Sequence, residues 1–502
     1  MRKSTKLAVL VAALVALCAM SAFAYTKGWA TLDGQWVYYT TTDGDLAYNE
    51  FRKSSDGNYY YLGDEGYMVT DQLVYDGGDT YYVDATGKRV VNAWVPVPSD
   101  EDEELDVTYR WYYFKSNGKA ATAEDCTGTN NTKTINGKKY AFDTDGKMLF
   151  GFVANGEILT DESAVLDADM YFGSNEDGSA QTGWFESFAD LNDAGEGDHN
   201  WFYFKTGKKY AGATKKIDGK TYEFKENGIM ITGWSIVTTA SGKVATGNFY
   251  GPVEDGSLRK KAWVWTVADK DDGADDPDSH WFWADGNGNY VYDTVRRING
   301  KHYAFDKDGI MLAGLVKVAA GTEIKSLTEN DVATFENAND DSKADYVDEM
   351  KNGSFDVYYF SGDEVNDGSL KTGTIKLALG DDEVTMFFDK SGKAISGLKN
   401  KKLYTYGILE TAGEERYAVA ENIAPADGEY NYYVVSTTGA TLRDGGTAKT
   451  ADDEWYAVCD GKIVLIKDKE NASKAASAFA KGATEYGGYD FEVGGYWVKK
   501  AY

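Results

Sequence analysis

The segment Ile135–Phe142 reads Ile-Asn-Gly-Lys-Lys-Tyr-Ala-Phe, and the chain repeats this pattern twice more. The copies are Ile-Asp-Gly-Lys-Thr-Tyr-Glu-Phe at Ile217–Phe224 and Ile-Asn-Gly-Lys-His-Tyr-Ala-Phe at Ile298–Phe305, so they begin 82 and 81 residues apart. Each copy places aromatic and apolar residues around an Asn-Gly or Asp-Gly pair, which is typical of a tight turn between two short strands. A fixed period of this length predicts a repeat architecture.

Each long repeat contains shorter units. Near the start of the chain the turn glycines Gly44, Gly66 and Gly87 follow one another at intervals of 22 and 21 residues, and an aromatic pair or triplet precedes each glycine. An isolated hairpin of this size is marginal in water because nothing covers its aromatic face, whereas stacked hairpins cover one another. The sequence therefore predicts an all-β fold, an elongated β-solenoid of stacked β-hairpin repeats.

The N-terminal residues are typical of a secretory signal. Arg2, Lys3 and Lys6 precede an apolar run over Leu7–Met20, and small residues at Ala22 and Ala24 follow the run. Fourteen residues are too few to span a bilayer, so we expect a secreted protein without membrane insertion. The expected organisation is a signal peptide (1–24), short repeats (25–110), long repeats of about 80–90 residues with acidic inserts (111–400), divergent β repeats (401–470) and a C-terminal cap or tail (471–502).

Charge and motif content exclude several functions. The formal net charge of −29 disfavours nucleic-acid binding, because polyphosphates need clustered cations. No nucleophile elbow, His-Glu-x-x-His pair or phosphate loop is present, so we predict no enzyme, no catalytic residue and no cofactor. The segments Asp100–Asp106 and Asp269–Asp278 each hold six acids, but their spacing lacks the EF-hand pattern. Solvated loops are therefore favoured over Ca²⁺ sites, and no metal site is expected.

A further motif carries a family resemblance. Gly28-Trp29 is followed after seven residues by Trp36 and then by Tyr38-Tyr39, and later Gly-Trp pairs stand at Gly183-Trp184 and Gly233-Trp234. This pattern resembles the cell-wall-binding, or choline-binding-type, repeat of secreted Gram-positive proteins, over residues 28–400 well and 400–465 weakly. Gly314-Leu315 and Gly397-Leu398 occupy the Gly-Trp position without an aromatic ring, so we expect those two sites to be silent.

The resemblance implies grooves between successive hairpins that bind choline on wall teichoic acids or, in glucan-binding relatives, sugar polymers. Aromatic faces are the main means of capturing a quaternary ammonium, at about 0.5–2 kcal/mol per ring. Carried onto this chain, the implied ligand-binding residues are Trp29, Trp36 and Tyr38; Trp94, Trp111 and Tyr113; Trp184, Trp201 and Tyr203; and Trp234, Trp263, Trp281 and Trp283; with Met148, Met230 and Met311 as adjacent walls.

The spacing of these rings departs from the family pattern. The second Trp follows the first after 17 residues in two of the later groups and after 18 in the third, and the two acidic segments account for much of the extra length. Such inserts could narrow, screen or replace a groove. Most aromatic residues in a solenoid serve packing, so only a minority of the rings is expected to face a ligand.

The function expected from these features is noncovalent attachment to the bacterial cell wall. The expected partner is a surface polymer, either choline-substituted teichoic acid or a neutral glycan, and many weak sites on one chain would act together. Two alternatives stay open, an extracellular glucan- or starch-binding protein and a protein-binding surface adhesin. The sequence leaves open the identity of the polymer, the number of working sites and the oligomeric state.

Overall fold

The structure is a computed structural model. It describes residues 25–99, 105–128, 130–161, 163–188, 199–238, 244–268, 278–319, 332–334, 343–362, 367–379, 382–426, 429, 431–442, 446–451, 453–459, 462–466, 468–479, 481, 483, 485–486, 489–491 and 497–499. The expected signal peptide (1–24) and most of both acidic segments (100–104 and 269–277) lie outside the described residues.

The chain forms two compact units, each described here by itself. Unit 1 comprises Met1–Gly233 and Gly251–Ser257, and unit 2 comprises Trp234–Tyr250 and Leu258–Tyr502. The expected subdivision of the repeats into short, long and divergent groups stays a prediction.

Unit 1 consists almost entirely of short strands. Its elements are β1 (Gly28–Leu32), β2 (Gln35–Tyr39), β3 (Glu50–Lys53), β4 (Tyr59–Leu62), β5 (Gln72–Asp76), β6 (Asp79–Val83), β7 (Ala93–Pro98), β8 (Tyr109–Phe114), the 3₁₀ turn η1 (Ala123–Asp125), β9 (Lys133–Ile135), β10 (Lys138–Tyr140), β11 (Phe152–Ala154), β12 (Glu157–Leu159), α2 (Ala164–Asp167), β13 (Met170–Tyr171), β14 (Gly183–Ser187), β15 (Asn200–Lys205), β16 (Lys208–Lys209), β17 (Ala213–Ile217) and β18 (Lys220–Phe224).

Unit 2 adds two longer helices to the same kind of strand. Its elements are β19 (Gly233–Thr238), whose first residue belongs to unit 1, β20 (Val244–Tyr250), β21 (Ala262–Val267), β22 (Ser279–Ala284), β23 (Thr294–Ile298), β24 (Lys301–Phe305), β25 (Met311–Leu312), β26 (Gly314–Ala319), β27 (Val332–Thr334), α3 (Lys343–Asn352), β28 (Phe355–Phe360), β29 (Gly373–Leu379), β30 (Asp382–Phe388), β31 (Gly397–Lys399), β32 (Lys402–Thr405), β33 (Ile408–Leu409), β34 (Tyr417–Glu421), β35 (Tyr432–Ser436), β36 (Thr447–Lys449), β37 (Trp455–Cys459), β38 (Lys462–Ile466), α4 (Lys469–Phe479), β39 (Glu485–Tyr486), β40 (Tyr489–Phe491) and β41 (Trp497–Lys499).

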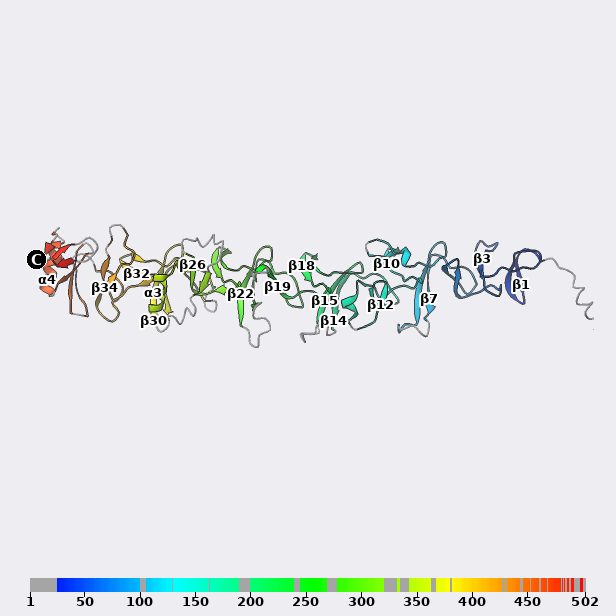
Figure 1. Cartoon of the computed structure of the whole chain (residues 1–502), viewed down its shortest axis with the longest axis horizontal. Coiled ribbons are helices and arrows are strands. Elements are labelled where there is room, and N and C mark those ends of the chain that lie inside the picture. The colour runs from blue at the N-terminus through cyan, green and yellow to red at the C-terminus, as the bar shows by residue number, and fades with distance from the viewer. Residues whose placement is uncertain are drawn as a thin grey trace, which may run out of the picture. The chain divides into compact units, whose positions relative to one another are not determined.

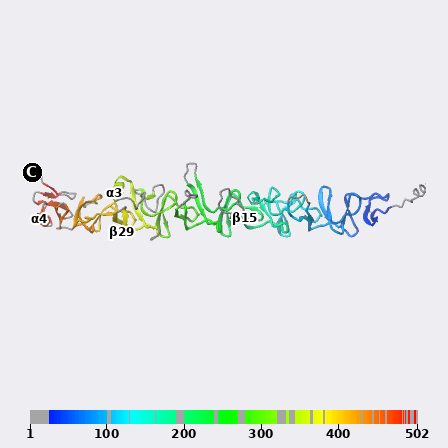
Figure 2. The same cartoon turned by 90° about the horizontal axis from the view of Figure 1, so that it is seen from below.

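Neighbouring strands pair as antiparallel hairpins. Most sheets have two or three strands, and the larger ones are six-stranded in unit 1 (β12-β11-β13-β16-β15-β14) and five-stranded in unit 2 (β29-β30-β33-β32-β31). Within each unit the hairpins follow one another in the order of the sequence, as the colours show in Figure 1 and, after a quarter turn, in Figure 2. The predicted all-β solenoid of stacked hairpins is confirmed.

A repeated contact joins successive hairpins. The residue two positions after one turn glycine packs against the turn glycine of the next hairpin, so that a Cβ on Gly178, for example, would lie 2.2 Å from Cε of Met148. A glycine is needed there because the approach is close and its φ is positive. The pairs are Leu46–Gly66, Met68–Gly87, Arg89–Gly118, Ala120–Gly146, Met148–Gly178, Ala180–Gly207, Lys209–Gly228 and Met230–Gly256 in unit 1, and Leu258–Gly288, Tyr290–Gly309, Met311–Gly368, Leu370–Gly392, Ala394–Gly407 and Leu409–Gly439 in unit 2.

The two longer helices differ in how well the sequence predicted them. Residues 471–481 are rich in Ala, Ser and Lys, a composition typical of a helix, and α4 packs against β37 through Ala472, Ala475 and Ala476. Helix α3 was not expected. It is held by Tyr346, which is fully buried and whose hydroxyl donates a hydrogen bond to the carbonyl of Tyr406 at 2.6 Å.

Candidate functional site

The predicted rings of the first hairpin lie on one face. In the β1–β2 register Trp29 stands opposite Tyr38, and Thr31 stands opposite Trp36. Val37 and Tyr39 point to the other face and are buried, whereas Trp36 is 49% exposed. The ring of Trp29 lies 5.5 Å from that of Tyr38, edge to face.

The long repeats keep this register despite their acidic inserts. The Gly-Trp or Ala-Trp ring again faces the aromatic residue that lies two positions after the first Trp of the next strand, and that first Trp faces a variable residue. The pairs are Trp94 with Tyr113 and Pro96 with Trp111, then Trp184 with Tyr203 and Glu186 with Trp201, then Trp263 with Trp283 and Trp265 with Trp281. The extra residues lie in the connection between the two strands, so they lengthen the hairpin loop without shifting the pairing.

The following hairpin closes each group of rings. The ring of Trp94 lies 4.8 Å from Tyr140, that of Trp184 lies 4.8 Å from Tyr222, and that of Trp263 lies 4.8 Å from Tyr303. The Phe two residues after each of these Tyr residues also lies near the Trp, with ring centroids 5.8, 6.0 and 5.9 Å apart in the three groups. We name the resulting clusters box 1 (Trp94, Trp111, Tyr113, Tyr140, Phe142), box 2 (Trp184, Trp201, Tyr203, Tyr222, Phe224) and box 3 (Trp263, Trp281, Trp283, Tyr303, Phe305).

The closing Tyr and Phe of each box were missed as site residues. They belong to the segment that recurs after 82 and 81 residues, so the repeat itself was the available signal. Burial raises the pKa of Tyr140, Tyr222 and Tyr303, and a neighbouring lysine and aspartate also act on each of these hydroxyls.

The three predicted methionines lie behind the boxes. Met148 and Met230 are buried, with 2% and 6% of their surface exposed, and Met311 is half-buried. Each belongs to the apolar cluster of its box and rests against the glycine of the next turn. They support the rings from inside, and a direct contact with a ligand stays a prediction.

Trp234 lies in a different set of rings from Trp263. Its neighbours are Phe249 at 5.0 Å, Phe282 at 4.8 Å and Tyr290 at 5.3 Å, and its Nε1 donates a hydrogen bond to the carbonyl of Val267 at 2.8 Å. The structure therefore separates the expected group of four Trp residues into box 3 and this second cluster.

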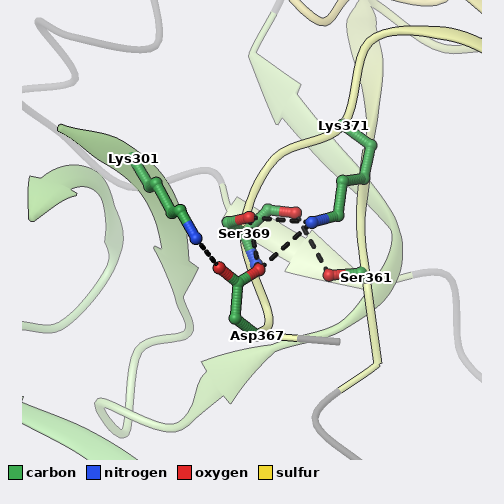
Figure 3. Close-up of polar contacts among 5 residues, drawn as sticks. All are labelled: Lys301, Ser361, Asp367, Ser369 and Lys371. Atoms are coloured by element: carbon green, nitrogen blue, oxygen red, sulfur yellow. Dashed lines mark hydrogen bonds and ion pairs between the residues drawn. The ribbon is translucent and has the colours of Figure 1, made fainter. Parts of the chain in front are cut away.

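An ion pair borders each box. In box 3, Lys301 pairs with Asp367, whose Oδ1 also accepts hydrogen bonds from Ser369 Oγ at 2.5 Å and Lys371 Nζ at 3.1 Å (Figure 3). The same arrangement joins Lys138 to Asp177 and Lys220 to Asp255, each at 2.7 Å, with a Ser two residues after the Asp donating to it. We call these three ion pairs the Lys-Asp clamps.

The clamps connect the Asn-Gly-Lys or Asp-Gly-Lys hairpin of each box to a later Asp-Gly-Ser turn. The glycine of that turn, for example Gly178, is the one covered by the methionine behind the box. Hydrogen bonds from Lys138 and Ser179 hold the pKa of Asp177 below its usual value, and those from Lys301 and Ser369 do the same for Asp367. The recurrence of Asp-Gly-Ser at 177–179, 255–257 and 367–369 was the overlooked signal.

Two further searches concern metals and membranes. Within the described residues, no three His, Cys, Asp or Glu side chains are grouped so that they could hold a metal ion. Among the helices described, none has both the length and the apolar character needed to cross a bilayer. Cys126 is a partly buried free thiol, and burial raises its pKa.

Comparison with known proteins supports the family resemblance. No family model matches the chain. Glucosyltransferase-I of Streptococcus downei is 27% identical over 277 residues, and Glucosyltransferase-S of Streptococcus mutans is 27% identical over 294 residues. The matches cover 55% and 58% of this chain but only 13% and 16% of the relatives, so this chain corresponds to a small part of their length.

Solved structures with similarity to this chain include choline-binding proteins of Streptococcus pneumoniae. The autolysin LytC matches with a TM-score of 0.33 and 17% identity, over 59% of this chain and 55% of its own. Choline binding protein F matches with a TM-score of 0.25 and 17% identity, over 72% and 98%. The resemblance to choline-binding-type repeat proteins is confirmed. The aromatic boxes are thus features of a chain similar to cell-wall-binding repeat proteins.

Proposed function

We propose that this protein attaches noncovalently to the bacterial cell wall by binding a surface polymer through its aromatic boxes. The observation that carries the proposal is the threefold recurrence of one box, with the same register, the same 4.8 Å closing contact and a bordering clamp. Each box keeps a partly exposed Trp, namely Trp111, Trp201 or Trp281. Several weak sites on one chain raise the overall affinity by about 10²–10⁴ when the polymer engages them together.

The net charge of the chain restricts the choice of polymer. At −29 the chain repels a bare polyanion, so the ligand carries cations, as choline-substituted teichoic acid does, or is neutral. A choline-bearing polymer is our first candidate; the pneumococcal proteins similar to this chain include choline binding protein F, and LytC was solved with a synthetic peptidoglycan ligand. We infer that the protein acts outside the cell and without catalysis of its own.

A neutral glucan is the second candidate, and one geometric observation favours it. The ring centroids within each box lie 4.8–5.2 Å apart in edge-to-face or tilted contacts, so the rings pack on one another and a ligand would meet their outward faces. An outward ring face is suited to stacking on a flat pyranose. The curated relatives are glucosyltransferases by name, which agrees with this alternative.

Binding to washed cell walls and to insoluble α-glucan, each with choline or soluble glucan as competitor, tests the proposal. The triple variant Trp111→Ala, Trp201→Ala and Trp281→Ala should lose binding by at least tenfold, because avidity multiplies the loss at each box. Tyr75→Ala is the matched control, since Tyr75 is 67% exposed and lies outside the boxes.

The competitor identifies the polymer. Elution from walls by choline supports the teichoic acid, whereas retention on glucan and elution by soluble glucan support the second candidate. Unchanged binding by the triple variant would exclude the boxes as the site. Failure of the parent protein to bind either material would leave the protein-binding adhesin.

A further inference from the structure

Arg89 lies among three aromatic rings of neighbouring hairpins. Its guanidinium carbon is 4.2 Å from the ring centre of Tyr59, 5.3 Å from that of Phe51 and 5.8 Å from that of Tyr81. All three distances are within the roughly 6 Å over which a ring face attracts a cation. The backbone N–H of Arg89 donates to the carbonyl of Tyr59 at 2.8 Å, which fixes the start of the side chain beside the rings.

The rings are the main surroundings of this charge. Nε of Arg89 is buried without a hydrogen-bond partner, and no carboxylate in the described part of the chain forms an ion pair with Arg89. A guanidinium is more weakly hydrated than an ammonium and stacks readily on aromatic faces, so it tolerates such a position. Arg52, in the preceding hairpin, differs because its guanidinium contacts one ring and pairs with Glu50.

Packing alone does not require a cation at this position. Arg89 stands two residues after Gly87, where the equivalent residues of other hairpins are Met68, Met148 and Met230. An uncharged Met covers the next turn glycine in those hairpins, as Arg89 covers Gly118 here. The charge of Arg89 therefore adds an interaction with the three rings, and the packing of one hairpin on the next does not require this interaction.

We propose that Phe51, Tyr59 and Tyr81 form a cation site that the chain fills with its own Arg89. The ligand class that fits the emptied site is a small organic cation, an alkylguanidinium or a quaternary ammonium. In the native chain this hairpin is consequently closed to cationic groups of a polymer, whatever the boxes bind. The inference concerns a site separate from the boxes and does not depend on their ligand.

The test uses the full chain with Arg89→Ala, and methylguanidinium and tetramethylammonium as probes. Hydrogen exchange of β3, β4 and β6 should be accelerated about tenfold in the Ala variant, and either probe should restore protection with a saturating concentration dependence. Arg89→Met should remain protected without a probe and should not respond to one. The Arg52→Ala variant is the control for a lost arginine that contacts only one ring.

The outcomes distinguish a cation site formed by the three rings from a purely structural role of Arg89. A saturating response confined to Arg89→Ala supports it, whereas no response, or an equal response in the parent or in Arg89→Met, overturns it. If Arg89→Ala does not fold, the parent still provides a readout in the side-chain NMR signals of Arg89. Ring faces shift these signals upfield, and Tyr59→Leu should return them toward solvent values; an unchanged shift would overturn the proposal.

Discussion

Gly309→Ala should destabilise its hairpin much more than Gly300→Ala, although both glycines occupy tight turns of unit 2. Their φ angles are similar, +83° and +89°, so the backbone cost of alanine is about 1–2 kcal/mol at each. The surroundings differ. A Cβ on Gly300 would meet no atom within 4 Å, whereas one on Gly309 would lie 2.5 Å from two ring carbons of Tyr290.

Tyr290 cannot move away easily because it is 5% exposed and its ring also contacts Trp234 at 5.3 Å. Overpacking of this kind costs about 1–3 kcal/mol. We therefore expect a loss of about 1–2 kcal/mol for Gly300→Ala and about 2–5 kcal/mol for Gly309→Ala. Tyr290→Ala places at this position the residue that Ala120 provides beside Gly146, where a Cβ would lie 3.1 Å from the Ala120 Cβ, and it should remove about 1–3 kcal/mol of the cost in the double variant.

Native-state hydrogen exchange of β23 and β24 is the suitable assay, since repeat arrays open locally and a single unfolding transition is not expected. The opening free energy of these strands is compared among the parent, the two glycine variants and the double variant. Equal losses for Gly300→Ala and Gly309→Ala would refute the steric contact. Strict additivity of Gly309→Ala with Tyr290→Ala would refute it as well.

Three further predictions concern polar contacts. The pKa of Asp177 is lowered in the folded chain, so its ion pair with Lys138 stabilises the fold above the unfolded pKa of about 4, and this stability is lost as pH falls through the lower folded value. Amide hydrogen exchange of the Asp-Gly-Ser turn should accelerate over that acidic range, and Asp177→Asn should remove this pH dependence. Lys209→Met should cost about 1–3 kcal/mol, because Nζ donates to two carbonyls of α2, whereas the exposed neighbour Lys208→Met should be neutral. Tyr346→Phe should cost about 1–3 kcal/mol by leaving a buried carbonyl unpaired, measured as faster exchange in α3.

Each of these three predictions has a contradicting result. A pH dependence that persists in Asp177→Asn would assign the acid sensitivity to another group. Equal effects of the two lysine variants would show that the hydrogen bonds to α2 contribute nothing specific. Unchanged exchange of α3 in the Phe variant would mean that packing alone holds the helix.

Local patterns made the hairpins predictable. Asn136-Gly137 and its copies specify a two-residue turn, and the two-residue period of a strand places Trp111 and Tyr113 together on one face. These signals lie within a few residues of one another, so they survive the acidic inserts. Rings that the sequence analysis grouped together, such as Trp94 and Tyr113, are therefore brought opposite each other.

Contacts between distant segments were not predictable in the same way. The three clamps join lysines and aspartates that are 39, 35 and 66 residues apart, so no fixed sequence spacing predicts these ion pairs. Tyr140 closes box 1 from a later hairpin, and the residues around Tyr140 in the sequence indicate only that it is a buried residue of a strand. Helix α3 lies within an insertion and depends on Tyr346 reaching Tyr406, which is 60 residues away.

Comparison within the chain bears on why the boxes contain Trp. Leu315 stands in the Gly-Trp position of its own hairpin, 81 residues after Trp234, and it lies opposite Tyr359 as Trp263 lies opposite Trp283. Leu315 is 1% exposed and belongs to an apolar cluster, so the hairpin packs fully without a Trp there. Packing therefore accepts an aliphatic residue at this position, and the recurrence of one ring geometry in three boxes requires another cause. The proposed stacking of a polymer on a partly exposed indole would provide that cause, because an aliphatic side chain offers no flat π face to a sugar or a cation.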